Sequence, residues 1–176
     1  MKVLPYILGV FLFILFIGIA YIGKVTPETH VYLGRQVPKR FINEIKSLGL
    51  LNDNEKIKYF YSDGFLDIKT GFYFVTDQKL VVYSSEWEEP ETIINFDEIA
   101  KLDIEFDDSF FDDSIIYLET KDGMEVTFPV SSEKKRDKAF FEFLLQMSGI
   151  DQNINNFDSL IDSSESIIIE DTIVKQ

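Results

Sequence analysis

An uninterrupted apolar run at the N-terminus constrains this chain most. Nineteen residues from Leu4 to Ile22 carry no charged side chain. A helix needs about 20 apolar residues to cross the roughly 30 Å hydrocarbon core of a bilayer. Lysines flank the run at both ends, and Tyr6 and Tyr21 stand where interfacial aromatic residues are expected. We therefore expect a single transmembrane anchor within residues 1–24.

Two other interpretations of this run remain open. The small residues Gly18 and Ala20 resemble the cleavage site of a secretory signal peptide, so that residues 1–20 would be removed. The run is longer than the roughly 7–15 apolar residues of a typical signal core, which favours an anchor. A helix buried in a protein core is the third interpretation, and so continuous an apolar run is unusual there.

The charges around the run bear on which side of the membrane the domain occupies. Lys2 and the free amine precede it, while Lys24, Arg35, Lys39 and Arg40 follow it. Cytoplasmic segments carry an excess of Lys and Arg. The pattern favours a bacterial inner-membrane protein with its domain in the cytoplasm, although the charges nearest the run are almost balanced.

The remaining chain is acidic, and this excludes several functions. The net charge is −14, with 15 acidic and two basic residues between Glu86 and Glu125. Nucleic-acid binding needs clustered Lys and Arg, so no nucleic-acid partner is expected. The chain has no cysteine, which removes disulfides, thiolate nucleophiles and Cys-based zinc sites. We expect no cofactor, since the sequence has no P-loop and no Gly-x-Gly-x-x-Gly.

Periodicity divides the soluble part into three segments. Residues 25–53 form a connector in which Phe41, Ile42 and Ile45 recur at helical spacing, predicting a short helix. This helix either packs on the domain or lies at the membrane surface. Residues 54–149 form a mainly β domain, and residues 150–176 an acidic, disordered tail. The β domain alternates with period two in six or seven antiparallel strands: Ile57–Tyr61, Phe72–Thr76, Lys79–Ser84, Thr92–Phe96, Lys101–Asp107, Ser114–Thr120 and Met124–Val130.

The pattern also makes two local predictions within this β domain. Residues 65–68 are expected to form a further short extended piece, and Met124 is expected to face inward with Val126, Phe128 and Val130. A C-terminal amphipathic helix follows, with Ser131 or Ser132 as its N-cap and Gly149 as its end.

The segment Gly71-Phe72-Tyr73-Phe74-Val75-Thr76-Asp77-Gln78-Lys79-Leu80-Val81-Val82-Tyr83 resembles a hairpin common in bacterial pleckstrin-homology-like (PH-like) and GRAM-like domains. Phe96-Asp97-Glu98-Ile99 and Phe140-Phe141-Glu142-Phe143-Leu144 resemble their next strand step and final helix. The resemblance covers residues 54–148. It implies an α+β fold, a PH-like partial barrel whose open end is plugged by the C-terminal helix. Because the middle of the chain is acidic, we do not expect binding to anionic lipid headgroups.

One loop carries the candidate chemistry. Asp107, Asp108, Asp112 and Asp113 place four carboxylates in seven residues, a pattern that fits either a hard-cation site or a solvated turn between two strands. Phe110 and Phe111 at its tip, together with Trp87 in an acidic loop, are candidates for partner contact. The single histidine, His30, cannot build a catalytic triad or a typical zinc centre alone.

These observations favour a single-pass, membrane-tethered, non-catalytic module that presents an acidic face to a basic protein partner. Complementary charge speeds capture of such a partner. One alternative is a metal-assisted hydrolase that uses the 107–113 loop. Another is an accessory subunit of a membrane complex.

Overall fold

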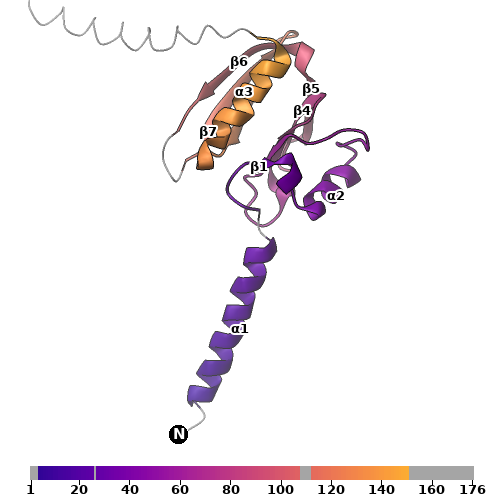
Figure 1. The fold of residues 1–176 in the computed structure, drawn as a ribbon. Coiled ribbons are helices and arrows are strands. Elements are labelled where there is room, and N and C mark those ends of the chain that lie inside the picture. The colour runs from indigo at the N-terminus through magenta and orange to yellow at the C-terminus, as the bar shows by residue number, and fades with distance from the viewer. Residues whose placement is uncertain (1–3, 26, 108–111, 151–176) are drawn as a thin grey trace, which may run out of the picture.

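The computed structural model describes residues 4–25, 27–107 and 112–150, and within the first helix the side chains of Tyr6–Ala20. Helix α1 (Leu4–Val25) extends away from the β domain (Figure 1). All of its described side chains are exposed. No helix among the described residues combines the length and hydropathy of a membrane span. The expected span Leu4–Ile22 reaches beyond the described side chains at both ends.

The described strands form two antiparallel sheets. Sheet A has the order β1-β2-β3-β4-β5, and sheet B the order β6-β7-β8. The strands are β1 Tyr32–Leu33, β2 Tyr59–Tyr61, β3 Phe72–Val75, β4 Lys79–Tyr83, β5 Glu91–Asn95, β6 Ile99–Glu105, β7 Ser114–Thr120 and β8 Glu125–Val130. The helices are α2 Lys39–Ser47 and α3 Arg136–Ser148, with 3-10 turns η1 Gly34–Gln36, η2 Ile68–Thr70, η3 Phe96–Glu98 and η4 Glu133–Lys135.

The predicted hairpin is β3–β4, and a threonine shapes its turn. The hydroxyl of Thr76 accepts hydrogen bonds from the backbone N–H groups of Gln78 (3.0 Å) and Lys79 (3.1 Å). A side chain that bonds the backbone two or three residues ahead stabilises a turn locally. This bonding explains why the Thr-Asp-x-Lys pattern predicts the hairpin from sequence.

Sheet A is buried on both faces, so β3, and β4 after its first residue Lys79, consist of apolar and aromatic residues. Tyr73 and Val75 face a core shared with sheet B and α3. Phe72 and Phe74 face a second core that includes Phe41 of α2. Sheets covered on both sides read as continuous apolar runs. Helix α2 therefore packs on the domain, as the first interpretation of its pattern holds, and it covers the face of sheet A opposite to the one that α3 covers.

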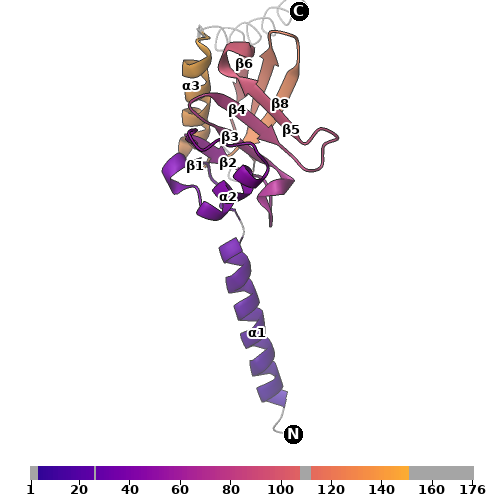
Figure 2. The same cartoon turned by 90° about the vertical axis from the view of Figure 1, so that its right-hand side faces the viewer.

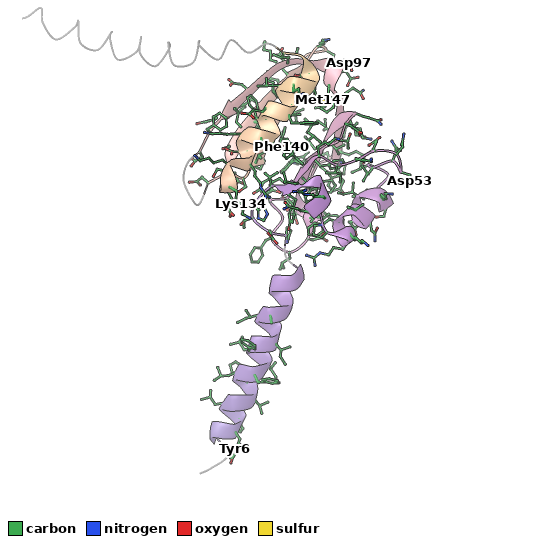
Figure 3. The ribbon with its side chains drawn as sticks, in the orientation of Figure 1. Tyr6, Asp53, Asp97, Lys134, Phe140 and Met147 are labelled. Carbon is green, nitrogen blue, oxygen red and sulfur yellow. The ribbon has the colours of Figure 1, made fainter. Side chains whose placement is uncertain are left out.

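Helix α3 closes the core between the two sheets, as a plugging helix should. Phe140 is fully buried, and its ring centroid lies 6.0 Å from that of Tyr59 and 6.2 Å from that of Phe128. Phe143 packs its ring against Phe96 and Tyr59. Gly149 ends the helix with φ +68°, the left-handed conformation that glycine adopts most readily. Figure 3 labels Phe140 midway along α3.

The strand count is the part of the prediction that is wrong. The described residues contain eight strands in two sheets, of which β2–β8 match the seven predicted ranges. The additional strand, β1, has two residues and lies in the connector, where Tyr32 pairs with Phe60. A strand this short has too few positions for alternation to reveal it.

Three local predictions also differ from the structure. Residues 65–68 are not extended, because the chain turns there and enters η2. Met124 is 41 % exposed in the turn before β8 and does not face inward. Neither Ser131 nor Ser132 caps α3 directly, since η4 intervenes and α3 begins at Arg136.

Candidate functional site

The outer face of sheet B gathers acidic side chains around a tyrosine. Alternation along β6 and β7 turns Leu102, Ile116 and Leu118 into the core and the intervening residues outward. Asp103 lies opposite Tyr117 in the register, and Glu119 lies opposite Glu125. We call this surface the acidic face: Asp103, Glu105, Tyr117, Glu119 and Glu125.

Two polar contacts organise this face. The hydroxyl of Tyr117 donates a 3.1 Å hydrogen bond to Glu105, which raises the pKa of Tyr117. Lys101 Nζ donates to Glu119 Oε2 at 2.5 Å, and this contact raises the pKa of the lysine. Lys101 is the one basic side chain on strands β6–β8 as the structure describes them. The acidic face therefore keeps a net negative charge at neutral pH, with a half-exposed aromatic ring at its centre.

The 107–113 loop does not form a cation site from its described part. The backbone N–H of Asp107 donates to Ser114, and Asp112 is exposed. Asp108, Phe110 and Phe111 lie outside the described residues. In residues 4–25, 27–107 and 112–150, no three His, Asp or Glu side chains converge as metal ligands would.

Asp113 instead turns inward to a pair of stacked tyrosines. Tyr61 donates its hydroxyl proton to Asp113 Oδ2 at 2.5 Å, and Tyr73 donates to Asp63 Oδ2 at 2.9 Å. The two rings stack with centroids 6.3 Å apart. Burial, followed by the neighbouring carboxylates, raises the pKa of Asp113. The two Tyr–Asp contacts therefore hold loop ends onto the core.

Trp87 lies in the loop between β4 and β5. Its backbone N–H donates to the carbonyl of Ser84, and its side chain is 42 % exposed. The ring neither closes the core fully nor joins the acidic face, which belongs to the other sheet. Trp87 remains a separate candidate for partner contact.

A polar hollow of about 280 Å³ lies where the chain enters the domain. Lys134 Nζ lies 3.2 Å from His30 Nδ1, and Glu28 Oε2 lies 3.0 Å from the same His30 nitrogen. Arg136 donates to the carbonyl of Val31 at 2.5 Å. Burial lowers the pKa of His30, and the charge of Lys134 lowers it further. These contacts fix the connector against the start of α3, whose Lys134 end lies nearest α1 in Figure 3.

Sequence patterns missed two parts of this arrangement. Tyr117 is predictable as an outward position, because Ile116 and Leu118 flank it in β7. Its place among the carboxylates depends on strand register and was not predicted. The His30 contacts join residues 104 positions apart, and no local pattern signals them.

The known proteins that resemble this chain were found by comparison with solved structures. No protein-family model matches the chain, and no curated protein matches it. A DUF1696 family protein with a pleckstrin-homology domain from Shewanella loihica PV-4 is 11% identical, with a TM-score of 0.47, over 69% of this chain and 99% of that chain. A pleckstrin homology domain from Shewanella amazonensis SB2B is 12% identical, with a TM-score of 0.44, over 62% of this chain and 86% of that chain.

A PH domain containing bacterial protein from Exiguobacterium sibiricum 255-15 is 19% identical, with a TM-score of 0.49, over 84% of this chain and 75% of that chain. The architecture itself carries the assignment. Two antiparallel sheets of five and three strands enclose a core, and a C-terminal helix closes it. That is the PH-like arrangement implied by the hairpin Gly71–Tyr83, and the resemblance is confirmed at the level of the fold.

Proposed function

We propose that this chain is a membrane-tethered, non-catalytic PH-like module whose acidic face binds a basic segment of a protein partner. One observation supports this most strongly. Asp103, Glu105, Glu119 and Glu125 lie on the solvent side of three neighbouring strands, around Tyr117. Aromatic residues are enriched at the energetic centres of interfaces, and complementary charge around them speeds encounter.

The proposed role is binding, not catalysis. The carboxylates of the acidic face are spread along strands and face solvent. Acid–base or metal chemistry needs groups that converge on one reacting atom. A flat, charged strand surface is instead suited to capturing a partner of opposite charge.

The tether is supported by the sequence of Leu4–Ile22 and by the exposure of α1. The run has the length of a span and no charge. Large apolar side chains, including Phe11, Phe13 and Phe16, are exposed all round the described part of α1. A helix apolar on every side needs an apolar environment. The flanking lysines and arginines favour a cytoplasmic domain at a bacterial inner membrane, which protease accessibility in intact cells and spheroplasts would test.

The partner proposal is tested by capture from detergent extracts over a series of salt concentrations. The double variant Asp103→Lys, Glu105→Lys reverses two charges of the acidic face without touching the core. We expect it to lose about tenfold in affinity, equivalent to about 1.4 kcal/mol. Binding by the unaltered chain should weaken as salt rises, because screening shortens the reach of exposed charges to about 10 Å at 0.1 M.

Two control variants each reverse one charge elsewhere, and combined they change the net charge as much as the double variant does. Glu142→Lys lies on the exposed side of α3, and Asp53→Lys lies beside α2 (Figure 3). Both should leave capture unchanged. A captured protein whose binding is indifferent to salt, or equally weakened by all three variants, would refute the assignment to this face.

A further inference from the structure

Two adjacent apolar side chains project from the β domain into solvent. Phe65 is 79 % exposed and Leu66 is 59 % exposed. Outside α1, they are the most exposed large apolar side chains among the described residues. Single exposed apolar residues are ordinary, whereas two adjacent, largely exposed apolar residues indicate a contact site.

The loop that carries the pair is firmly held. The hydroxyl of Ser62 donates to the carbonyl of Gly71 at 2.7 Å and accepts from the backbone N–H of Gly64 at 3.2 Å. Asp67 caps η2 by accepting from the N–H of Lys69 at 3.0 Å. A Cβ at Gly64 would lie 2.1 Å from the carbonyl oxygen of Asp67, so only glycine fits this close turn.

Hydrogen bonds thus fix both ends of the loop, and its tip points outward. A flexible loop would bury these side chains, or would lose conformational entropy when contact ordered them. A rigid loop presents them at little further cost. The exposure is therefore a property of the folded loop.

The strand register places this loop at the end of the domain that faces α1. Tyr32 of β1 pairs with Phe60 of antiparallel β2, so the chain leaves β2 where it enters β1 from α1. Residues 62–71, which follow β2, consequently lie beside the incoming connector. Five residues, 26–30, separate Val25, the end of α1, from Val31, so the Cα atoms of Val25 and Val31 lie at most about 20 Å apart. Figures 1 and 2 show the domain meeting α1 at this end.

We propose that Phe65 and Leu66 insert into the interfacial layer of the bilayer that holds α1, and so fix the orientation of the domain on the membrane. This rests on the proposed tether. A patch of two side chains is too small to recruit a membrane or a protein from solution. Tethering makes the contact intramolecular, so a small patch near the bilayer suffices.

The lipid chemistry follows from the neighbouring charges. Asp63 and Asp67 flank the pair, and a surface of anionic headgroups would repel them. A zwitterionic headgroup layer accepts aromatic and aliphatic side chains without that repulsion. The acidic face lies on the other sheet and stays available to its partner.

The test measures immersion of single sites in the full chain reconstituted into phosphatidylcholine vesicles. The chain has no cysteine, so Phe65→Cys, Leu66→Cys and Met124→Cys each provide one position for a nitroxide label. Met124 is the matched control, since it is an exposed apolar residue in the β7–β8 turn at the opposite end of the domain. Collisions with oxygen, which concentrates in lipid, are compared with collisions with a water-soluble nickel chelate.

We expect labels at 65 and 66 to favour oxygen and the label at 124 to favour the nickel chelate. Flotation of the vesicles, measured on the same samples, separates the two proposals. Labels at 65 and 66 that favour nickel on protein that floats would overturn this inference and leave the tether intact. If labels at 65 and 66 favour nickel in vesicles alone but become protected from nickel once a cell extract is added, the loop is assigned to a protein partner instead. Protein that does not float would overturn both.

Discussion

Removal of the Phe140 side chain should unfold the β domain under mild conditions. Phe140 is fully buried and packs its ring against Tyr59 of sheet A and Phe128 of sheet B. Replacing a buried Phe by Ala costs about 3–5 kcal/mol, because transfer and cavity terms add. A single domain has about 5–15 kcal/mol to lose. The Phe140→Ala variant therefore loses a substantial share of its stability.

The assay is urea unfolding of the full chain in detergent, followed by fluorescence. The chain has one tryptophan, Trp87, which lies in the β domain and reports its unfolding. With a slope of about 1–3 kcal/mol per molar urea, the midpoint should fall by roughly 2 M. Phe143→Ala is the control, since Phe143 is only partly buried, and it should cost about 1–2 kcal/mol.

The comparison of the two variants tests the closing role of α3. If Phe140→Ala costs no more than Phe143→Ala, then α3 does not seal the core between the sheets. The PH-like account of the C-terminal helix would then be wrong.

Three further predictions concern the loop, the connector and the buried carboxyl. Gly64→Ala should destabilise the domain by about 1–3 kcal/mol, because the added Cβ clashes with the carbonyl of Asp67. At Gly123 a Cβ would meet open space, so Gly123→Ala should cost about 1–2 kcal/mol through backbone strain alone. Thermal unfolding compares the two variants. Burial lowers the pKa of His30 below 6.5, so the unfolded state binds more protons than the folded state does. The stability of the domain should therefore fall as pH drops below about 6.5. His30→Gln should remove that dependence. Because the pKa of Asp113 is raised above 3.8, its contribution has the opposite sign, and stability is lost as pH rises through the folded pKa. Asp113→Asn, which still accepts the hydrogen bond from Tyr61, should remove this loss. For both residues the unfolding midpoint is measured against pH, and a variant that keeps the pH profile of the unaltered chain would contradict the assignment.

The sequence predicted those elements whose determinants are local. The β3–β4 hairpin follows from alternation and from the bonds of Thr76 to its own turn. The end of α3 follows from Gly149 and its left-handed backbone. The outward side of β6 follows from the strict alternation of Leu102 and Ile104 with charged residues.

The features that sequence reasoning missed depend on contacts between distant segments. The loop that exposes Phe65 is shaped by Ser62 bonding Gly71 and by η2, where a short apolar run suggested an extended piece. The hollow at His30 needs Lys134 and Arg136 from the other end of the chain. Likewise, the acidic face takes shape only when register brings Tyr117 beside Asp103.

Membrane attachment through residues 1–24 is the claim on which the account depends most. Alkaline carbonate extraction of membranes tests it directly, using the full chain and a variant that lacks residues 1–24. Carbonate strips peripheral proteins and leaves spanning helices in place, because only the latter bury an apolar helix in hydrocarbon. The account predicts that the full chain stays in the membrane pellet while the truncated chain enters the supernatant. A full chain that is extracted by carbonate would contradict it.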